Sequence, residues 1–515
     1  MKKLLNNKII RDTALLTLMQ LLLDSASLLI NAFITRRLGA SATGLLSLTG
    51  AFLSLAGILS NGSAFLCTSR LISAETGREN GSPERVLLHG IRLCMLLSTA
   101  VSAVILLFSG SISRRFFGDA EMASALRMMP AALITGAAGA CLKGYFNAVR
   151  RAGIAAACDM TEFAVRSLLI VAMTLSAGSP DATDFTRILI LSVTAGSFSS
   201  LLLLLVLFAC QPHGSKGQGT LTFRQYAALA FPIMGGGILT SLLSSTNDAL
   251  IPFCLRQYGD SADAALSLFG VFEAIVIPTL FFPSVVLCSM SGVIVSESAR
   301  AAAAGNRERI ASLSSRLLSG TLAYAIFAAA VLLRTGSPLG ELLGGGETAG
   351  RMITVIAPVV PFIYLEIILE ALIKGLGQQG FSSLNYLAEY VIRIAAVLIL
   401  VPVTGFTGIA VSYYASNIFG NTMRLVKVLR CTGISLRPAE TILMPALAAL
   451  SSLACAELLF HAAGTATEEL PGLAVLISVW MLFYGGILYL VRILNTGSIN
   501  KGNLLLKLHK EERQM

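Results

Sequence analysis

The chain has 515 residues, of which 55% are hydrophobic and 13% are charged, and its formal net charge is +10. This composition, with a mean hydropathy of +0.77, excludes an ordinary soluble domain and indicates a membrane protein. The basic residues stand in short loops between apolar stretches, so membrane topology and anionic lipids account for them better than nucleic acid does.

Apolar stretches long enough to span a bilayer recur from end to end of the chain. A helix crosses the hydrocarbon core with about 20 apolar residues, so we expect an all-α polytopic membrane protein with about 14 transmembrane helices. The basic N-terminus precedes no small-residue cleavage site, which favours a retained first span over a signal peptide. The predicted spans are 13–34, 44–68, 86–109, 126–148, 154–176, 187–209, 226–254, 265–294, 311–333, 350–373, 383–402, 408–429, 438–461 and 471–492.

The sequence contains an internal duplication. The stretch from Leu142 to Asn147 is echoed by Ile373 to Gln378, and in each half an acid and an arginine follow, four residues apart. Gly39–Ala42 and Leu46–Gly50 have counterparts in Gly259–Ala262 and Leu266–Gly270. Such repeats define two tandem halves.

The duplication predicts the domain organisation. Six helices begin and end on one side of the membrane, so the two six-helix bundles are parallel repeats with a cavity between them. The loops and tail on the side of both termini carry most of the 38 Lys and Arg residues, so both termini are expected in the cytoplasm. The predicted parts are an N-lobe with helices 1–6 (1–210), a cytoplasmic linker (211–225), a C-lobe with helices 7–12 (226–430), helices 13–14 (431–495) and a basic cytoplasmic tail (496–515).

Charged residues within spans are candidates for function, because they are costly there and face protein or a water-filled cavity. Glu162 with Arg166, and Glu389 with Arg393, are spaced to pair along one helix face. We interpret them as structural ion pairs within each lobe, with direct substrate contact as the alternative. Lys143 and Lys374, near the cytoplasmic ends of their spans, are expected to extend toward lipid phosphates.

A further group of residues offers oxygen atoms to a cation. Asp248, Asn385 and Glu389 together would suit Na⁺ or a proton. The alternative is that these side chains contact only water or neighbouring hydroxyl groups.

The candidates for substrate binding in the cavity are three arginines and two acids. Arg36, Arg37 and Arg256 mark the outer ends of the first and seventh helices, against the positive-inside trend, and guanidinium groups suit phosphate. A solvated rim is the alternative for these arginines. Asp24 and Glu273 lie within the first and eighth spans.

Prolines and glycines are expected to interrupt three helices of the second half, which makes that half the more pliable one. These positions are Pro232 with Gly235–Gly237, Pro278 with Pro283, and Pro358 with Pro361.

The sequence has no motif typical of an enzyme. We find no HExxH, no P-loop, no zinc-type Cys/His cluster and no plausible catalytic triad, so neither catalysis nor a cofactor is expected. The nine cysteines are scattered, mostly inside apolar spans, where thiols usually fill space.

Several motifs together resemble a known family. Arg37–Gly44, Lys143–Phe146, the Glu162/Arg166 pair and Leu268–Glu273 are similar to the stage V sporulation protein B group. That group belongs to the polysaccharide transporter family of the multidrug/oligosaccharidyl-lipid/polysaccharide (MOP) flippase superfamily, which also contains MurJ-type lipid II flippases. The resemblance covers essentially the whole chain.

The resemblance implies two lobes around a central cavity, alternating access, and translocation of an undecaprenyl-pyrophosphate-linked oligosaccharide or peptidoglycan precursor. It also implies a sodium site between helices 7, 11 and 12, at Asp248, Asn385 and Glu389, and a groove for the lipid tail at the last two helices. MurJ-type flippases carry arginines in the first helix, where this chain has Asp24 and Asn31. The resemblance therefore predicts a lipid-linked glycan and not lipid II in particular.

The leading hypothesis is accordingly a flippase of a bacterial plasma membrane, driven by a cation or by the membrane potential, with anionic lipids and cell-wall glycan polymerases as partners. A cation-coupled multidrug exporter is the alternative, because carboxylates would suit organic cations. The acids that favour it are Asp24, Asp248, Glu273, Glu366 and Glu370. A third reading is a scaffold that recruits polymerases and transports nothing.

Overall fold

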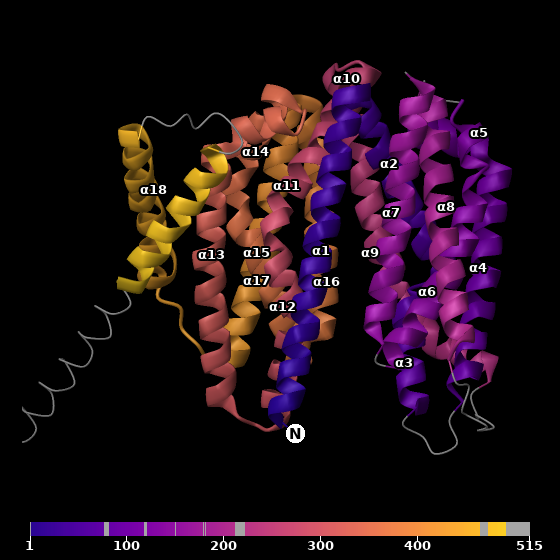
Figure 1. Ribbon diagram of the computed structural model, residues 1–515, viewed down its shortest axis with the longest axis horizontal. Coiled ribbons are helices and arrows are strands. Elements are labelled where there is room, and N and C mark those ends of the chain that lie inside the picture. Colours follow the sequence, from indigo (N-terminus) through magenta and orange to yellow (C-terminus); the bar gives the residue numbers. More distant parts are fainter. Residues whose placement is uncertain are drawn as a thin grey trace, which may run out of the picture. The chain divides into compact units, whose positions relative to one another are not determined.

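The computed structural model describes residues 2–76, 82–117, 121–149, 151–178, 180, 182–211, 222–463 and 472–490. Every regular element within these ranges is a helix (Figure 1). Most of the predicted linker, at 212–221, and the predicted tail at 496–515 lie outside the described residues. The elements are α1 (Lys2–Leu38), α2 (Ala40–Asn61), α3 (Ala64–Thr76), α4 (Pro83–Ile112), η1 (Ser113–Phe117), α5 (Ala123–Leu126), α6 (Met129–Ala148), α7 (Ala152–Ala177), α8 (Ala182–Ala209), α9 (Phe223–Tyr258), α10 (Ala262–Val271), η2 (Phe272–Val276), α11 (Ile277–Phe281), η3 (Phe282–Ser284), α12 (Val285–Ala303), α13 (Arg307–Leu342), α14 (Gly346–Ile356), η4 (Ala357–Val359), α15 (Val360–Gly375), α16 (Gln379–Thr404), α17 (Phe406–Thr432), η5 (Ala439–Leu443) and α18 (Met444–Ala463), followed by the helix Gly472–Leu490.

The predicted all-α polytopic fold is confirmed. Twelve helices or helix runs of the described chain are long and apolar enough to cross a membrane. The two remaining predicted spans also fall on single helices, α7 with 26 residues and α17 with 27. The chain is therefore a multi-pass membrane protein.

The duplication is visible in two turns of the backbone. α1 ends before Gly39, and α9 ends before Gly259, with φ angles of +90° and +119°. These angles favour glycine, which has no Cβ. The two glycines begin the matching stretches found in the sequence, so the repeat preserves a turn as well as a pattern.

The repeated Lys-Gly motif makes the same contact in each half. A Cβ added to Gly144 on α6 would lie 2.7 Å from the carbonyl oxygen of Phe65 on α3. A Cβ added to Gly375 on α15 would lie 2.8 Å from the carbonyl oxygen of Val295 on α12. Glycine at these positions lets two helix backbones touch, as small residues do in membrane helix packing.

A second close approach joins α2 to α10. A Cβ built on Gly44 would collide with the backbone of Leu266, and one built on Gly270 would collide with the backbone of Gly44. These helices come from the two copies of the repeat, and they pack backbone to backbone.

The predicted helix interruptions are present at two of three places. The π-helix η2 and the 3₁₀-helix η3 lie around Pro278 and Pro283, and the 3₁₀-helix η4 contains Pro358. The interruption predicted at Pro232 is wrong, because α9 is one continuous helix over Phe223–Tyr258. A proline removes a single backbone donor, so the hydrogen bonds on either side can keep a helix continuous.

The chain divides into two compact units. The first comprises Met1–Met290, Leu343–Ala349 and Gln379–Gly420, and the second comprises Ser291–Leu342, Gly350–Gln378 and Asn421–Met515. In the first unit α6 packs against α3, α4 and α8, α7 against α8, and α9 against α16. In the second unit α13 packs against α15 and α18. The division into an N-lobe and a C-lobe stays a prediction.

The last two helices are fixed to α13 by a buried aromatic cluster in the second unit. Trp480, which is fully buried, donates its indole N–H to Ala449 O and Ser452 Oγ, both at 3.0 Å. The rings of Trp480 and Tyr484 lie 5.4 Å and 4.7 Å from that of Phe327 on α13. These contacts make the final helix pair an integral part of this unit.

Candidate functional site

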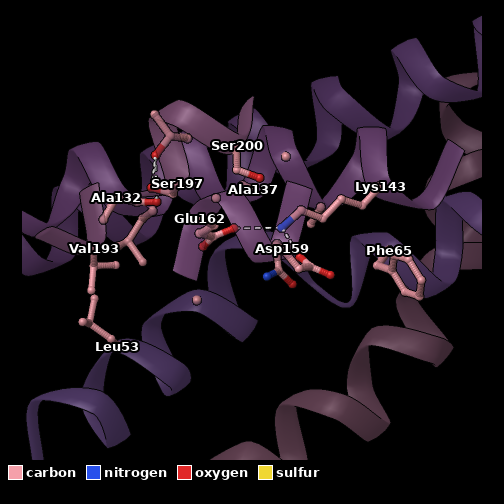
Figure 2. A pocket seen from close by; sticks show the side chains of 17 residues that line it. Leu53, Phe65, Ala132, Ala137, Lys143, Asp159, Glu162, Val193, Ser197 and Ser200 are labelled. Carbon is pink, nitrogen blue, oxygen red and sulfur yellow. Dashed lines mark hydrogen bonds and ion pairs between the residues drawn. The ribbon is translucent and has the colours of Figure 1, made fainter. Parts of the chain in front are cut away.

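A cluster of three charged side chains joins α6 to α7 in the first unit. Lys143 Nζ lies 2.6 Å from Asp159 Oδ1 and 2.8 Å from Glu162 Oε2 (Figure 2). The lysine side chain is 17% exposed, so its ammonium is neutralised by the two carboxylates and does not extend toward lipid phosphates as the sequence suggested. Sequence analysis identified Glu162 but gave Lys143 and Asp159 no role at a site.

A cavity of about 470 Å³ lies on one side of this cluster. Small residues on α6 provide much of its space, because Ala132, Gly136 and Ala140 leave room that larger side chains would fill. Polar groups from α2, α6 and α8 face the same space. They belong to Asn61, Thr135, Ser197 and Ser200.

A second cavity of about 350 Å³ shares the same three charged residues. It lies between α1 and α7, and Asp24, Ser27 and Arg166 also line it. Asp24 accepts a hydrogen bond of 2.8 Å from the side-chain amide of Gln20. The fold therefore brings Asp24, Glu162 and Arg166, which sequence analysis singled out separately, to one polar cavity.

The partner of Glu162 in the structure differs from Arg166, the partner that the sequence predicted. Glu162 forms its ion pair with Lys143, while the Arg166 guanidinium lies 5.4 Å from the centre of the Phe163 ring. Because Arg166 is four residues after Glu162 on α7, the two charges still attract each other.

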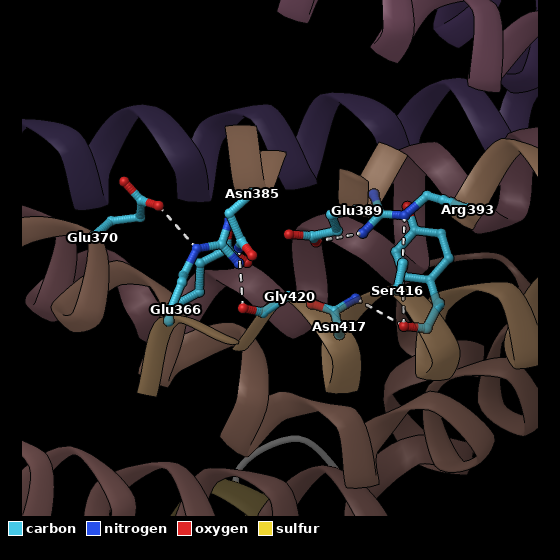
Figure 3. A network of polar contacts seen from close by, with 10 residues as sticks. Glu366, Glu370, Asn385, Glu389, Arg393, Ser416, Asn417 and Gly420 are labelled. Atoms are coloured by element: carbon cyan, nitrogen blue, oxygen red, sulfur yellow. Dashed lines mark hydrogen bonds and ion pairs between the residues drawn. The ribbon is translucent and has the colours of Figure 1, made fainter. Parts of the chain in front are cut away.

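The equivalent pair in the second copy is formed within its own helix. Arg393 Nη2 donates to Glu389 Oε1 at 3.3 Å, and Arg393 Nε donates to Ser416 Oγ at 2.9 Å (Figure 3). The guanidinium also lies 4.6 Å from the centre of the Tyr413 ring. These interactions fix Arg393 between α16 and α17.

The three residues considered for a cation are all in the first unit. Glu389 is engaged by Arg393, and the Asn385 side-chain amide donates to Gly420 O at 3.1 Å. Asp248 accepts a weak hydrogen bond of 3.3 Å from Asn247. A cation bound here would compete with Arg393 for Glu389, and the described residues contain no group of three or more His, Cys, Asp or Glu side chains arranged around a metal.

Glu273, a cavity candidate, belongs to the same region of the first unit. It lies on the π-helix η2, partly buried, and interacts electrostatically with both Asp248 and Arg393. Glu273 is thus grouped with the cation candidates and not with Arg36, Arg37 and Arg256.

The three arginines considered for substrate binding are exposed. Arg36 and Arg37 lie in the last turn of α1, and Arg256 lies in the last turn of α9. The linings of the two cavities described above do not include these arginines. Their role in phosphate binding stays a prediction.

Sequence analysis missed a fully buried arginine in the second unit. Arg424 on α17 has no exposed surface, and its Nε and Nη2 atoms lie 2.8 Å and 3.1 Å from Glu370 Oε1 and Glu366 Oε1. Lys374 Nζ lies 3.4 Å from Glu370 Oε2 (Figure 3 shows both glutamates). The signal in the sequence was two glutamates on one face of an apolar span, which require a nearby cation.

No family model matches the chain. Stage V sporulation protein B of Bacillus subtilis (strain 168) is 20% identical over 419 residues, which cover 79% of this chain and 81% of that protein. A structure of the lipid II flippase MurJ in an inward closed conformation superposes with a TM-score of 0.70 at 15% identity, covering 93% of this chain and 100% of MurJ. An inward-facing multidrug resistance MATE family transporter of the MOP superfamily gives a TM-score of 0.64 at 13% identity, covering 80% of this chain and 96% of that one.

The chain is thus similar in sequence to stage V sporulation protein B, and its fold is similar to that of the MurJ and MATE structures. The resemblance inferred from the residues is thereby confirmed. At 13–15% identity the likeness to the solved structures concerns the fold alone.

Proposed function

We propose that the chain is a flippase that moves an undecaprenyl-pyrophosphate-linked oligosaccharide or peptidoglycan precursor from the inner to the outer leaflet of a bacterial plasma membrane. The observation that supports this most is the extent of the structural likeness. The lipid II flippase MurJ aligns with 93% of this chain, whereas the MATE transporter aligns with 80%. The final helix pair, held by Trp480, is the part that a transporter with twelve spans would lack.

The proposed mechanism is alternating access of the two lobes. Arg36, Arg37 and Arg256 at the outer helix ends would hold the pyrophosphate, because guanidinium groups form paired hydrogen bonds with phosphate oxygens. The polar cavities of the first unit would admit the sugar hydroxyl groups. A gradient of Na⁺ or H⁺, or the membrane potential, would drive the cycle, with both termini in the cytoplasm and cell-wall glycan polymerases as partners that receive the product.

Depletion of the protein in its own host tests this proposal. We expect a lipid-linked sugar to accumulate with its head group in the inner leaflet, since nothing then carries it outward. Chemical labelling from outside the cell, followed by mass spectrometry of the lipid, measures the accumulation and names the substrate. If every undecaprenyl-linked lipid stays equally accessible in a host without a second flippase, the proposal is wrong.

Charge reversal of the outer arginines tests the binding residues. We expect Arg37→Glu and Arg256→Glu each to lower complementation of the depleted host by about tenfold or more, because a hydrogen-bonded contact to a charged phosphate is lost and repulsion replaces it. The protein in the membrane should be unchanged, because both side chains are exposed. Arg316→Glu, at an exposed position of α13, is the matched control. Normal complementation by both variants would remove these arginines from the substrate path.

One observation favours the export of organic cations as a second candidate. The larger cavity is lined by two carboxylates, Asp159 and Glu162, and by one ammonium, that of Lys143, and this balance suits a cationic ligand. On this reading, expression should raise resistance to ethidium and speed its efflux from loaded cells. If ethidium efflux is unchanged on expression and a lipid-linked sugar accumulates on depletion, the flippase is the better supported of the two functions.

A further inference from the structure

The two copies of the repeat show two different arrangements of one acid–arginine pair. In the second copy Glu389 is bonded to Arg393 on the same helix, at 3.3 Å. In the first copy the corresponding acid, Glu162, is bonded to Lys143 on the preceding helix, at 2.8 Å, although Arg166 has the same four-residue spacing. The glutamate of the duplicated helix thus has a different partner in each copy.

The surroundings explain which arrangement is fixed and which can change. Around Glu389, which is 5% exposed, Arg393 is held additionally by Ser416 and by the Tyr413 ring, so that arrangement is locked. Glu162 is 29% exposed and lines both cavities of the first unit, so its carboxylate has room to move. The Arg166 guanidinium lines the smaller of these cavities and lies over the Phe163 ring.

We propose that Glu162 exchanges partners between Lys143 and Arg166, and that this exchange leaves the Lys143 ammonium with Asp159 as its one remaining carboxylate partner, so that it can also bind an anionic head group. In the arrangement of the structure, Lys143 joins α6 to α7 (Figure 2). The same lysine lines both cavities. When Glu162 turns to Arg166, the link between α6 and α7 weakens to the half-exposed contact with Asp159. The ammonium then faces both cavities, where a phosphate oxygen is a suitable acceptor.

The exchange keeps the Glu162 carboxylate paired with a cation, which keeps the free-energy cost of the exchange low. Glu162 remains paired in both states, and no carboxylate is left alone in an apolar span. A change between two discrete, paired arrangements is what a conformational cycle needs. The identity of the anion as a phosphate rests on the proposed function, whereas the exchange itself does not.

The rate at which Lys143 is acetylated by acetic anhydride tests the exchange in the purified protein, with mass spectrometry as the readout. An ammonium between two carboxylates reacts slowly, so the rate reports how often Lys143 is released. Arg166→Gln removes the alternative partner of Glu162, so we expect the Lys143 rate to fall by about three- to fivefold. Arg166→Lys keeps a cation at this position and should restore most of the rate.

Glu162→Gln should act in the opposite direction and raise the Lys143 rate, because only Asp159 then holds the ammonium. Adding Arg166→Gln to Glu162→Gln should change nothing further, since Arg166 acts through Glu162. Lys374, which is 49% exposed and paired with Glu370, serves as the internal reference in every sample.

Two outcomes would overturn the proposal. If Arg166→Gln leaves the Lys143 rate unchanged while Glu162→Gln raises it, the Lys143–Glu162 pair is a fixed link. If Arg166→Gln slows the reaction equally with and without Glu162, the effect is indirect. Rates that change as expected in a protein that moves no lipid-linked sugar would leave the exchange standing and refute the proposed function instead.

Discussion

Under the proposed function, replacing Gly136 by phenylalanine should lower transport by at least about tenfold, because the new side chain would occupy the larger cavity of the first unit. Gly136 lines that cavity, and a Cβ built on it has no neighbour within 4 Å. Gly136→Ala should therefore be tolerated, while the aromatic ring would exclude substrate. The measurement is complementation of the depleted host, normalised to the amount of protein in the membrane.

The control for this variant is a glycine that has as much space for an added side chain but does not line a described cavity. Gly50 on α2 is exposed, with no atom within 4 Å of an added Cβ, and does not line either described cavity. Gly50→Phe should leave complementation intact. If both phenylalanine variants behave alike, the cavity beside Lys143 is not part of the transport path.

Replacing Arg424 by methionine should lower the free energy of unfolding by about 3–5 kcal/mol, because Glu366 and Glu370 would lose their buried partner. The guanidinium is fully buried and lies 2.8 Å and 3.1 Å from the two carboxylates. Unfolding of the purified protein in mixed detergent micelles measures the loss. Arg334→Met, which breaks an exposed pair with Glu457, should cost no more than about 1 kcal/mol.

A compensated variant separates the lost charge partner from lost packing. Combining Arg424→Met with Glu366→Gln and Glu370→Gln removes all three charges, so most of the lost stability should return. If the triple variant is as unstable as Arg424→Met alone, then the packing of Arg424 matters and its charge does not.

The helices and their order could be predicted because each span must be apolar over the thickness of a bilayer. The interruptions at Pro278 and Pro358 were also predictable, since proline lacks a backbone donor. The continuity of α9 through Pro232 could not be predicted, because it depends on how the backbone hydrogen bonds next to the missing N–H of this proline are arranged.

The candidate site was predictable only in part. Spacing along one helix predicts the Glu389–Arg393 pair, which the structure contains. It cannot predict that Glu162 bonds Lys143, 19 residues earlier, or that Arg424 bonds Glu370, 54 residues earlier. Those pairings depend on which helices are neighbours, and this information is not in the local pattern.

The contact between Gly44 and Gly270 constrains how the sequence can vary. Either glycine would collide with the opposite backbone if it gained a side chain, so neither position can change alone without moving α2 away from α10. Relatives that keep this crossing should have glycine at both positions, and relatives that lose one glycine should lose the other. Covariation of these two glycines, one from each copy of the repeat, would then be evidence that the two copies have kept this contact since the duplication.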